Sequence, residues 1–287
     1  MFKKFTQIWQ KTNKKQPLFL RKLSKKGSLL FNISKRQKFI ISVIILSLIL
    51  FWSEQLFGKG GVYIAIFLSI AADLFVFWAI RKDLENNFSL QVFILPLFYT
   101  LACALFYFLV PARFLTRVGM TSLFALGLYS LLLSENIFIV SSIRTIALSA
   151  SARTVSFIVT LLSYFFLANV VFSLHFNIFI TLLLVFMFSF PLILHSIWTH
   201  TLERDVKSNI NWITLLAVCL VETAFVLWFW PSTPTIIALF LTCLFYILVG
   251  ISQVWIEKRL FKGVMWEYVW VAVIVFIVFI TFSLRAT

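Results

Sequence analysis

The stretch IFITLLLVFMFSFPLILHSIW, residues 178–198, decides the fold class, because 21 consecutive residues contain no Lys, Arg, Asp or Glu. A helix needs roughly 20 apolar residues to cross the ~30 Å hydrocarbon core of a bilayer. The rest of the chain has the same character, since 62% of its 287 residues are hydrophobic and only 12% are charged. Soluble domains are much less apolar. The sequence therefore predicts an all-α, polytopic transmembrane bundle.

Eight further segments are long and apolar enough to cross a membrane. These predicted spans are residues 39–57, 62–80, 88–110, 118–140, 155–174, 210–230, 235–256 and 264–284. Polar residues interrupt the end of span 118–140, so residues 134–153 either continue that span or form a helix at the membrane interface. With residues 178–198, the prediction is nine spans.

The distribution of Lys and Arg indicates how the predicted spans are oriented. If the N-terminus lies in the cytoplasm, 21 of the 25 Lys and Arg residues fall on the cytoplasmic side and four on the other side. Cytoplasmic segments of membrane proteins carry such an excess of positive charge. We therefore expect a cytoplasmic N-terminus and an external C-terminus.

Residues 1–38 are predicted to form a basic cytoplasmic or interfacial tail, ahead of a transmembrane domain over residues 39–287. The tail has no Asp or Glu, and its cations include Lys3, Lys4, Lys11, Lys14, Lys15, Arg21 and Lys22. Each cation beside an anionic leaflet gains on the order of 1 kcal/mol. We expect the tail to bind the anionic headgroups of the lipid bilayer. A protein partner is the first alternative, and nucleic acid is disfavoured because no nucleic-acid-binding motif accompanies the charge.

Three acidic side chains lie well inside the predicted spans: Asp73, Glu135 and Glu222. Glu54 and Glu267 are close enough to span ends to reach water. A charge in hydrocarbon costs at least ~2.5 kcal/mol, so such groups normally face protein or water. Asp73 and Glu222 are interpreted as paired with polar or basic groups of neighbouring helices, or as protonated, since burial disfavours the charged carboxylate. A proton or cation relay is the functional alternative, and a catalytic role is a further one.

Polar side chains gather in SENIFIVSSIRTIALSASAR, residues 134–153, at the predicted cytoplasmic side. Glu135 and Arg144 are nine residues apart and fall on opposite faces of a continuous helix, which excludes a pair within one helix. The segment is interpreted as a small-residue helix contact with a basic anchor. A pocket for a lipid headgroup or a substrate is the alternative.

The three histidines do not form a metal-binding pattern. His195 is the only one well inside a predicted span, and we expect His175 and His200 to lie in loops. The i, i+5 spacing of His195 and His200 does not place two ligands on one helical face. No zinc or haem site is therefore expected.

The longer stretch LLLSENIFIVSSIRTIALSASARTVSFIVTLL, residues 131–162, resembles a stretch in uncharacterised polytopic membrane proteins of bacteria with reduced genomes. The resemblance implies a bacterial membrane, and it implies no activity. We expect the location to be the cytoplasmic membrane, with the chain crossing it several times.

Motifs of familiar membrane enzymes are absent from the sequence. HExxH, GxSxG and the Walker motif are all missing, so we expect no metalloprotease or serine-hydrolase activity, no ATP binding and no cofactor. Gly and Pro are scarce inside the predicted spans, whereas mobile carriers need broken helices and close helix contacts. We expect a structural or accessory subunit of envelope or membrane-assembly machinery. A transporter of small solutes or ions that uses the buried acids is the first alternative, and a lipid-handling membrane enzyme is the second.

Overall fold

The computed structural model describes residues 34–57, 60–84, 90–111, 113–141, 149–201 and 209–286. Across these ranges the long elements are α-helices, and nine of them are long and apolar enough to cross a membrane. The prediction of an all-α, polytopic membrane protein is confirmed. The chain divides into two units, Met1–Lys38 and Phe39–Thr287, and the second unit is the helical bundle.

Two groups of predicted functional residues lie outside the described residues. One is Arg144. The other is the set of lipid-binding cations in the basic tail, namely Lys3, Lys4, Lys11, Lys14, Lys15, Arg21 and Lys22. Both remain predictions from the sequence.

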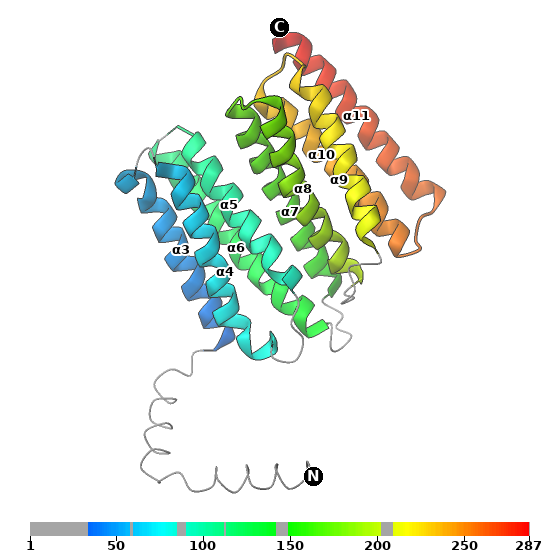
Figure 1. Cartoon of the computed structure of the whole chain (residues 1–287). Helices are drawn as coiled ribbons and strands as arrows, with labels where there is room; N and C mark the ends of the chain where they lie inside the picture. Colours follow the sequence, from blue (N-terminus) through cyan, green and yellow to red (C-terminus); the bar gives the residue numbers. More distant parts are fainter. Residues whose placement is uncertain are drawn as a thin grey trace, which may run out of the picture. The chain divides into compact units, whose positions relative to one another are not determined.

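The helices follow the predicted spans in order (Figure 1). They are α3 (Lys35–Phe57), α4 (Gly61–Leu84), α5 (Ile94–Leu109) after the short 3-10 helix η3 (Leu90–Phe93), α6 (Phe114–Ser141), α7 (Ser149–Ser173), α8 (Ile178–Thr201), α9 (Ile210–Trp228), α10 (Pro234–Ile256) and α11 (Lys262–Ala286). Several helices extend beyond the predicted apolar spans, because polar residues at the ends continue the backbone hydrogen bonding. The polar segment 134–153 accordingly divides between two spans, with its start in α6 and its end in α7.

Short connections fold neighbouring helices into antiparallel hairpins. Residues 174–177 join α7 to α8, and residues 229–233 join α9 to α10. His175 makes the first turn with a positive φ of 48°, and it lies in a loop as predicted. Pro234 begins α10, where a helix does not need the missing N–H. Because the described residues form an odd number of spans, Phe39, where the second unit begins on α3, and the end of α11 lie at opposite ends of the helices (Figure 1).

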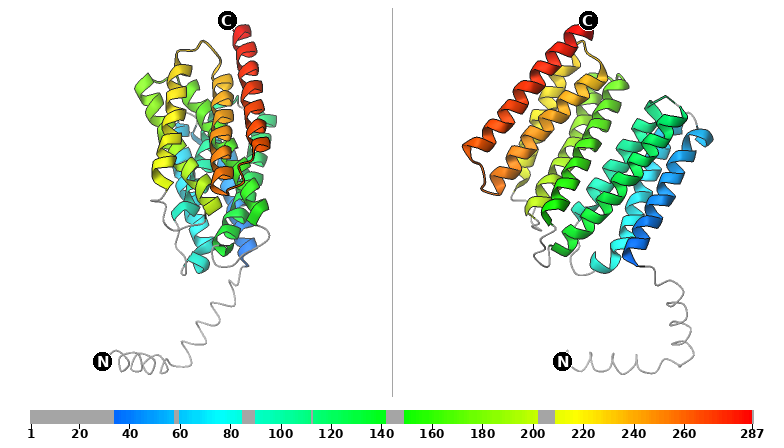
Figure 2. Two further views of the ribbon diagram at one scale, coloured as in Figure 1. Left: turned by 90° about the vertical axis from the view of Figure 1, so that its right-hand side faces the viewer. Right: turned by 180° about the vertical axis from the view of Figure 1, so that it is seen from behind.

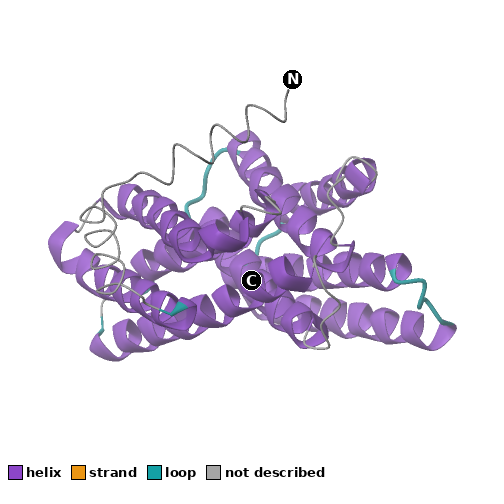
Figure 3. Ribbon diagram, turned by 90° about the horizontal axis from the view of Figure 1, so that it is seen from below, coloured by secondary structure: helices purple, strands orange, loops and turns teal. Residues whose placement is uncertain are grey.

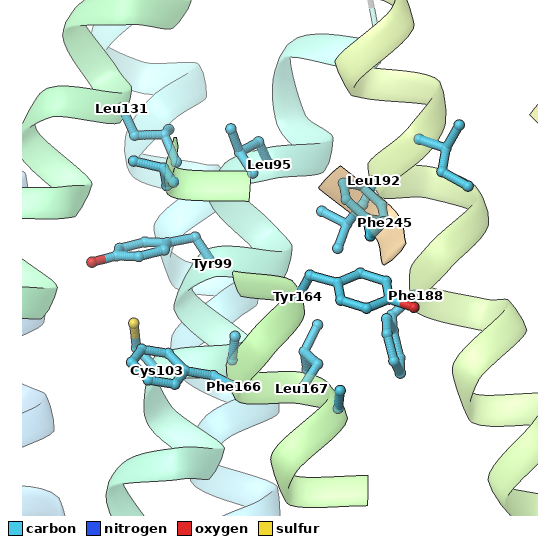
Figure 4. Packing of buried hydrophobic residues seen from close by; sticks show 14 of the residues in the cluster. Leu95, Tyr99, Cys103, Leu131, Tyr164, Phe166, Leu167, Phe188, Leu192 and Phe245 are labelled. Atoms are coloured by element: carbon cyan, nitrogen blue, oxygen red, sulfur yellow. The ribbon is translucent and has the colours of Figure 1, made fainter. Parts of the chain in front are cut away.

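The centre of the helical bundle is α7, which packs against α5, α6, α8 and α10. In its most apolar stretch 67% of the residues are buried, the largest share of any described span. The ring of Tyr164 lies 4.5 Å from that of Phe245 on α10 and 5.1 Å from that of Phe188 on α8, measured between centroids (Figure 4). Its hydroxyl shares a hydrogen bond of 3.2 Å with Ser189 Oγ. A single tyrosine thus connects three helices.

A close contact between α5 and α6 depends on Gly127. The Tyr99 hydroxyl donates a hydrogen bond of 2.9 Å to the carbonyl oxygen of Leu123, and it lies directly against Gly127. A Cβ atom at position 127 would clash with this hydroxyl. A residue without a side chain is therefore required for the tyrosine to cross to the backbone of α6.

The outermost helices of the bundle are α3 and α11, which lie at opposite edges (Figure 2). The apolar stretch of α11 is only 6% buried, and this helix packs mainly on α10. Seen from below, the described residues are helical apart from short loops that connect the helices (Figure 3). In a bilayer, the exposed apolar faces of these helices contact lipid or other membrane proteins.

Candidate functional site

A buried acid–base pair joins α6 to α8. His195 Nε2 lies 2.9 Å from Glu135 Oε1, and both side chains are 0% exposed. The two residues are 60 positions apart, and their helices both pack against α7. A hydrogen bond of this length between an imidazole and a carboxyl group shares one proton. The pair is thus a buried hydrogen bond between two helices in the interior of the bundle.

The Glu135–His195 pair retains unused hydrogen-bonding capacity. Glu135 Oε2 and His195 Nδ1 are buried and find no hydrogen-bond partner among the described residues. The indole of Trp198 covers one side, with its centroid 5.9 Å from that of the imidazole, and it also meets the edge of Phe138. An unpartnered polar atom in such surroundings costs about 1–3 kcal/mol. The pair is therefore polar, enclosed and incompletely satisfied.

A second cluster surrounds Glu257, which directly follows α10. Glu257 Oε1 lies 3.1 Å from Arg153 Nη1 on α7 and 2.8 Å from His200 Nδ1 on α8. Its other oxygen lies 3.7 Å from the exposed guanidinium of Arg259. Arg153 Nη2 also donates a hydrogen bond of 3.5 Å to the carbonyl oxygen of His200. One carboxylate therefore connects the ends of three helices on the predicted cytoplasmic side.

The expectation that His200 lies in a loop is wrong. It belongs to the last turn of α8, which runs from Ile178 to Thr201. The helix continues through three polar residues, Thr199, His200 and Thr201. The His200 side chain forms a hydrogen bond with Glu257. The apolar stretch ends before the helix does, so hydropathy alone placed the boundary too early.

A third tie lies between the first two and connects α8 to α10. Gln253 Nε2 donates hydrogen bonds to Ser196 Oγ at 2.7 Å and to the Ser196 carbonyl oxygen at 3.3 Å, and both side chains are buried. Ser196 follows His195 in sequence, and Gln253 precedes Glu257 by one helical turn. Along the last two turns of α8, the His195 side chain thus binds α6 and Ser196 binds α10, while the backbone carbonyl of His200 accepts a hydrogen bond from Arg153 on α7.

Glu222 has a different environment from the two clusters. It lies on α9 with an exposed side chain, and it lines a groove of about 510 Å³ between α9, α10 and α11. The groove is otherwise mainly apolar, with Phe240, Phe276 and Phe279 on its walls. The Thr223 hydroxyl, which also lines it, already donates to the carbonyl oxygen of Cys219. Glu222 is therefore an acid on the lateral, membrane-facing side of the bundle.

Asp73 lies on α4 and is partly buried. Its Oδ1 atom is inaccessible and has no hydrogen-bond partner within the described ranges. Asp73, Glu135 and Glu222 belong to three different helices, and none of the described interactions connects any two of them. Among the residues that the structure describes, no group of three or more His, Cys, Asp or Glu side chains could hold a metal ion.

Residues 56–282 match the family described as Protein of unknown function (DUF5656). The chain belongs to the DUF5656 family. The match covers α4 to α10 and all but the last residues of α11, and so includes both polar clusters and the α9–α11 groove, whereas the basic tail and most of α3 precede it. No curated protein and no solved structure matches the chain.

The cluster around Glu257 was not anticipated from the DUF5656 sequence, although a signal for it exists. Glu257 follows an apolar span directly, and predicted topology places it on the same side as Arg153 and His200. Opposite charges at span ends on one side of the membrane are candidates for pairing, since both lie near the interface. Which of these charged residues pair with one another depends on which helices are neighbours in the fold.

Proposed function

We propose that this DUF5656 protein is a structural or accessory subunit of a membrane assembly, located in a bacterial cytoplasmic membrane with its N-terminus inside. The proposal rests on the interior polar groups near one end of the bundle, which bind neighbouring helices to one another. Three ties, Glu135–His195, Ser196–Gln253 and the Glu257 cluster, connect helices α6, α7, α8 and α10. They support a fixed scaffold.

A carrier would have to break such ties in each transport cycle. Alternating access rocks one group of helices against another around a fixed site. Removing one partner from a buried charged pair typically costs about 3–5 kcal/mol, because the other charge stays buried and uncompensated. Separating α8 from both α6 and α10 would break two buried contacts at once. The arrangement favours helices that keep their positions.

A proton-coupled transporter is the second candidate, and the Glu135–His195 pair favours it. Ionisable residues inside membrane bundles often form proton relays. Glu135 Oε2 and His195 Nδ1 each lack a hydrogen-bond partner among the described atoms, so either could pass a proton to a further group. A relay needs movement or bound water at this place, which distinguishes it experimentally from a scaffold.

The test uses the purified full chain in sealed vesicles that contain a pH-sensitive dye. We expect proton flux under an imposed pH gradient and membrane potential to equal that of protein-free vesicles. Flux that requires the protein and disappears in Glu135→Gln would contradict the scaffold and support the transporter. In a parallel measurement, the chain extracted from its native membrane with mild detergent should elute together with another membrane protein. Elution as a lone 33.3 kDa chain would contradict an accessory role.

A further inference from the structure

The α9–α11 groove leaves a carboxyl group without a visible partner on the membrane-facing surface. Glu222 is exposed there, and the walls around it are mainly aromatic and aliphatic. An ionisable side chain within the hydrocarbon normally faces the bundle interior, a protein partner or water. Because Glu222 faces outward, its partner is expected to come from outside this chain.

The depth of Glu222 narrows the chemistry of that partner. It lies six residues before Trp228, the last residue of α9, so at 1.5 Å per residue it is about 9 Å below the helix end. The Trp230 indole donates a hydrogen bond of 2.5 Å to Ser283 Oγ on α11, which places the outer end of the groove at this level. Lipid chains at the depth of Glu222 carry no hydrogen-bond donor. A protein side chain can reach it.

Charge complementarity selects a basic side chain. The described Lys and Arg residues of the spans lie within five residues of a helix end, whereas Glu222 is the seventh residue from the end of α9. A second copy of this chain would therefore bring the cations of its described spans to a shallower level. A transmembrane helix of another protein, with Lys or Arg placed at the matching depth, meets the requirement.

The shape of the surface also suits a helix. α10 packs against both α9 and α11 and lies between them (Figure 2), so the two outer helices form the rims of the groove. Side chains of an added helix would pack between the ridges on such a surface, at interaxial distances of about 8–10 Å. The low burial of α11 leaves one rim accessible from the membrane.

We propose that the α9–α11 groove binds a transmembrane helix of a second membrane protein, and that a Lys or Arg of this helix pairs with Glu222. This inference rests on the proposed accessory role and names the surface and the chemistry of the partner. The groove, the exposed carboxylate and its depth all belong to the same site.

The experiment places a photoreactive benzoylphenylalanine at Phe276, which is exposed in the groove, in the full chain in its native membrane. The matched control carries the same group at Phe179, an exposed phenylalanine on α8. We expect a cross-linked product only from position 276. Its cross-linked peptide should be an apolar segment of roughly 20 residues that contains Lys or Arg.

Charge variants test the pairing itself. Glu222→Gln, which keeps the size of the side chain but removes its negative charge, should reduce the cross-linking yield at least tenfold. Glu267→Gln, at an exposed acid on α11, should leave the yield unchanged. Glu222→Lys combined with an acidic residue at the partner's basic position should restore cross-linking. This rescue also answers the objection that a single variant fails to fold.

Several results would overturn the inference. Cross-linking to lipid alone, to a second copy of this chain, or to a helix without a basic residue would each contradict it. If position 276 gives no product while the extracted chain still elutes with another membrane protein, the groove assignment fails and the accessory role survives. If the chain also elutes alone, both fail.

Discussion

Replacing His195 with Leu should destabilise the bundle more than an ordinary change inside a membrane protein. Both members of the Glu135–His195 pair are 0% exposed, so removal of the imidazole leaves the carboxyl group buried with neither oxygen partnered. Hydrogen bonds between transmembrane helices couple by ~0.6 kcal/mol on average and ~1.7 kcal/mol at most. A buried ionic pair that loses one partner costs about 3–5 kcal/mol. Protonation of Glu135 would limit the loss, so we expect a decrease of about 3 kcal/mol in the free energy of unfolding.

A double-mutant cycle measures the interaction energy between Glu135 and His195 separately from the contacts that each makes with other residues. Glu135→Leu should cost a similar amount, whereas the double variant Glu135→Leu, His195→Leu should lie within about 1 kcal/mol of the native chain, because no polar group then remains unpaired. The assay is equilibrium unfolding in mixed micelles, followed by steric trapping or tryptophan fluorescence. Single variants that each cost less than 1 kcal/mol, with a coupling energy near zero, would refute the reasoning.

Three further predictions concern other parts of the chain. Gly127→Ala should lower the free energy of unfolding by about 1–3 kcal/mol, because the added methyl group clashes with the Tyr99 hydroxyl on α5. Gly119→Ala should change it little, because the space around Gly119 is open. Thermal unfolding in micelles compares the two variants. Glu257→Leu should cost about 1–2 kcal/mol in the same assay, and Arg259→Ala less than about 0.5 kcal/mol, because that guanidinium is 76% exposed. A synthetic peptide of residues 1–33 should sediment with anionic vesicles at low salt and be released by 0.5 M salt; equal binding to neutral vesicles would contradict the lipid-headgroup prediction.

The spans were predictable because hydrophobic length is a local property of the chain. The segment 178–198 can be recognised without knowledge of its neighbours, and α8 indeed contains it. The ends were less accurate where polar residues continue a helix, as at His200. Here the boundary depends on a partner, Glu257, that lies 57 residues away.

The site was only partly predictable, for a physical reason. Helices that are apolar on all sides carry little information about which face is buried. The sequence therefore indicates how deep in the membrane a residue lies, but not which way its side chain points. Glu135 was recognised as an intramembrane acid, yet its contact with His195 depends on how α6 and α8 are rotated against α7. Glu222 was recognised in the same way, and its exposure on the lateral surface was not foreseen.

The central claim is that α7, α8 and α10 keep fixed positions at the ends that the charge distribution predicts to be cytoplasmic. Thr154 on α7 and Lys258 after α10 are both exposed. Spin labels at these two positions report the distance between the ends of α7 and α10, measured by double electron–electron resonance in lipid nanodiscs. The three native cysteines, Cys103, Cys219 and Cys243, are first replaced by Ser. A scaffold predicts one narrow distance distribution that is unchanged between pH 5 and pH 8. A second distance population that grows with pH or with added solute would contradict it.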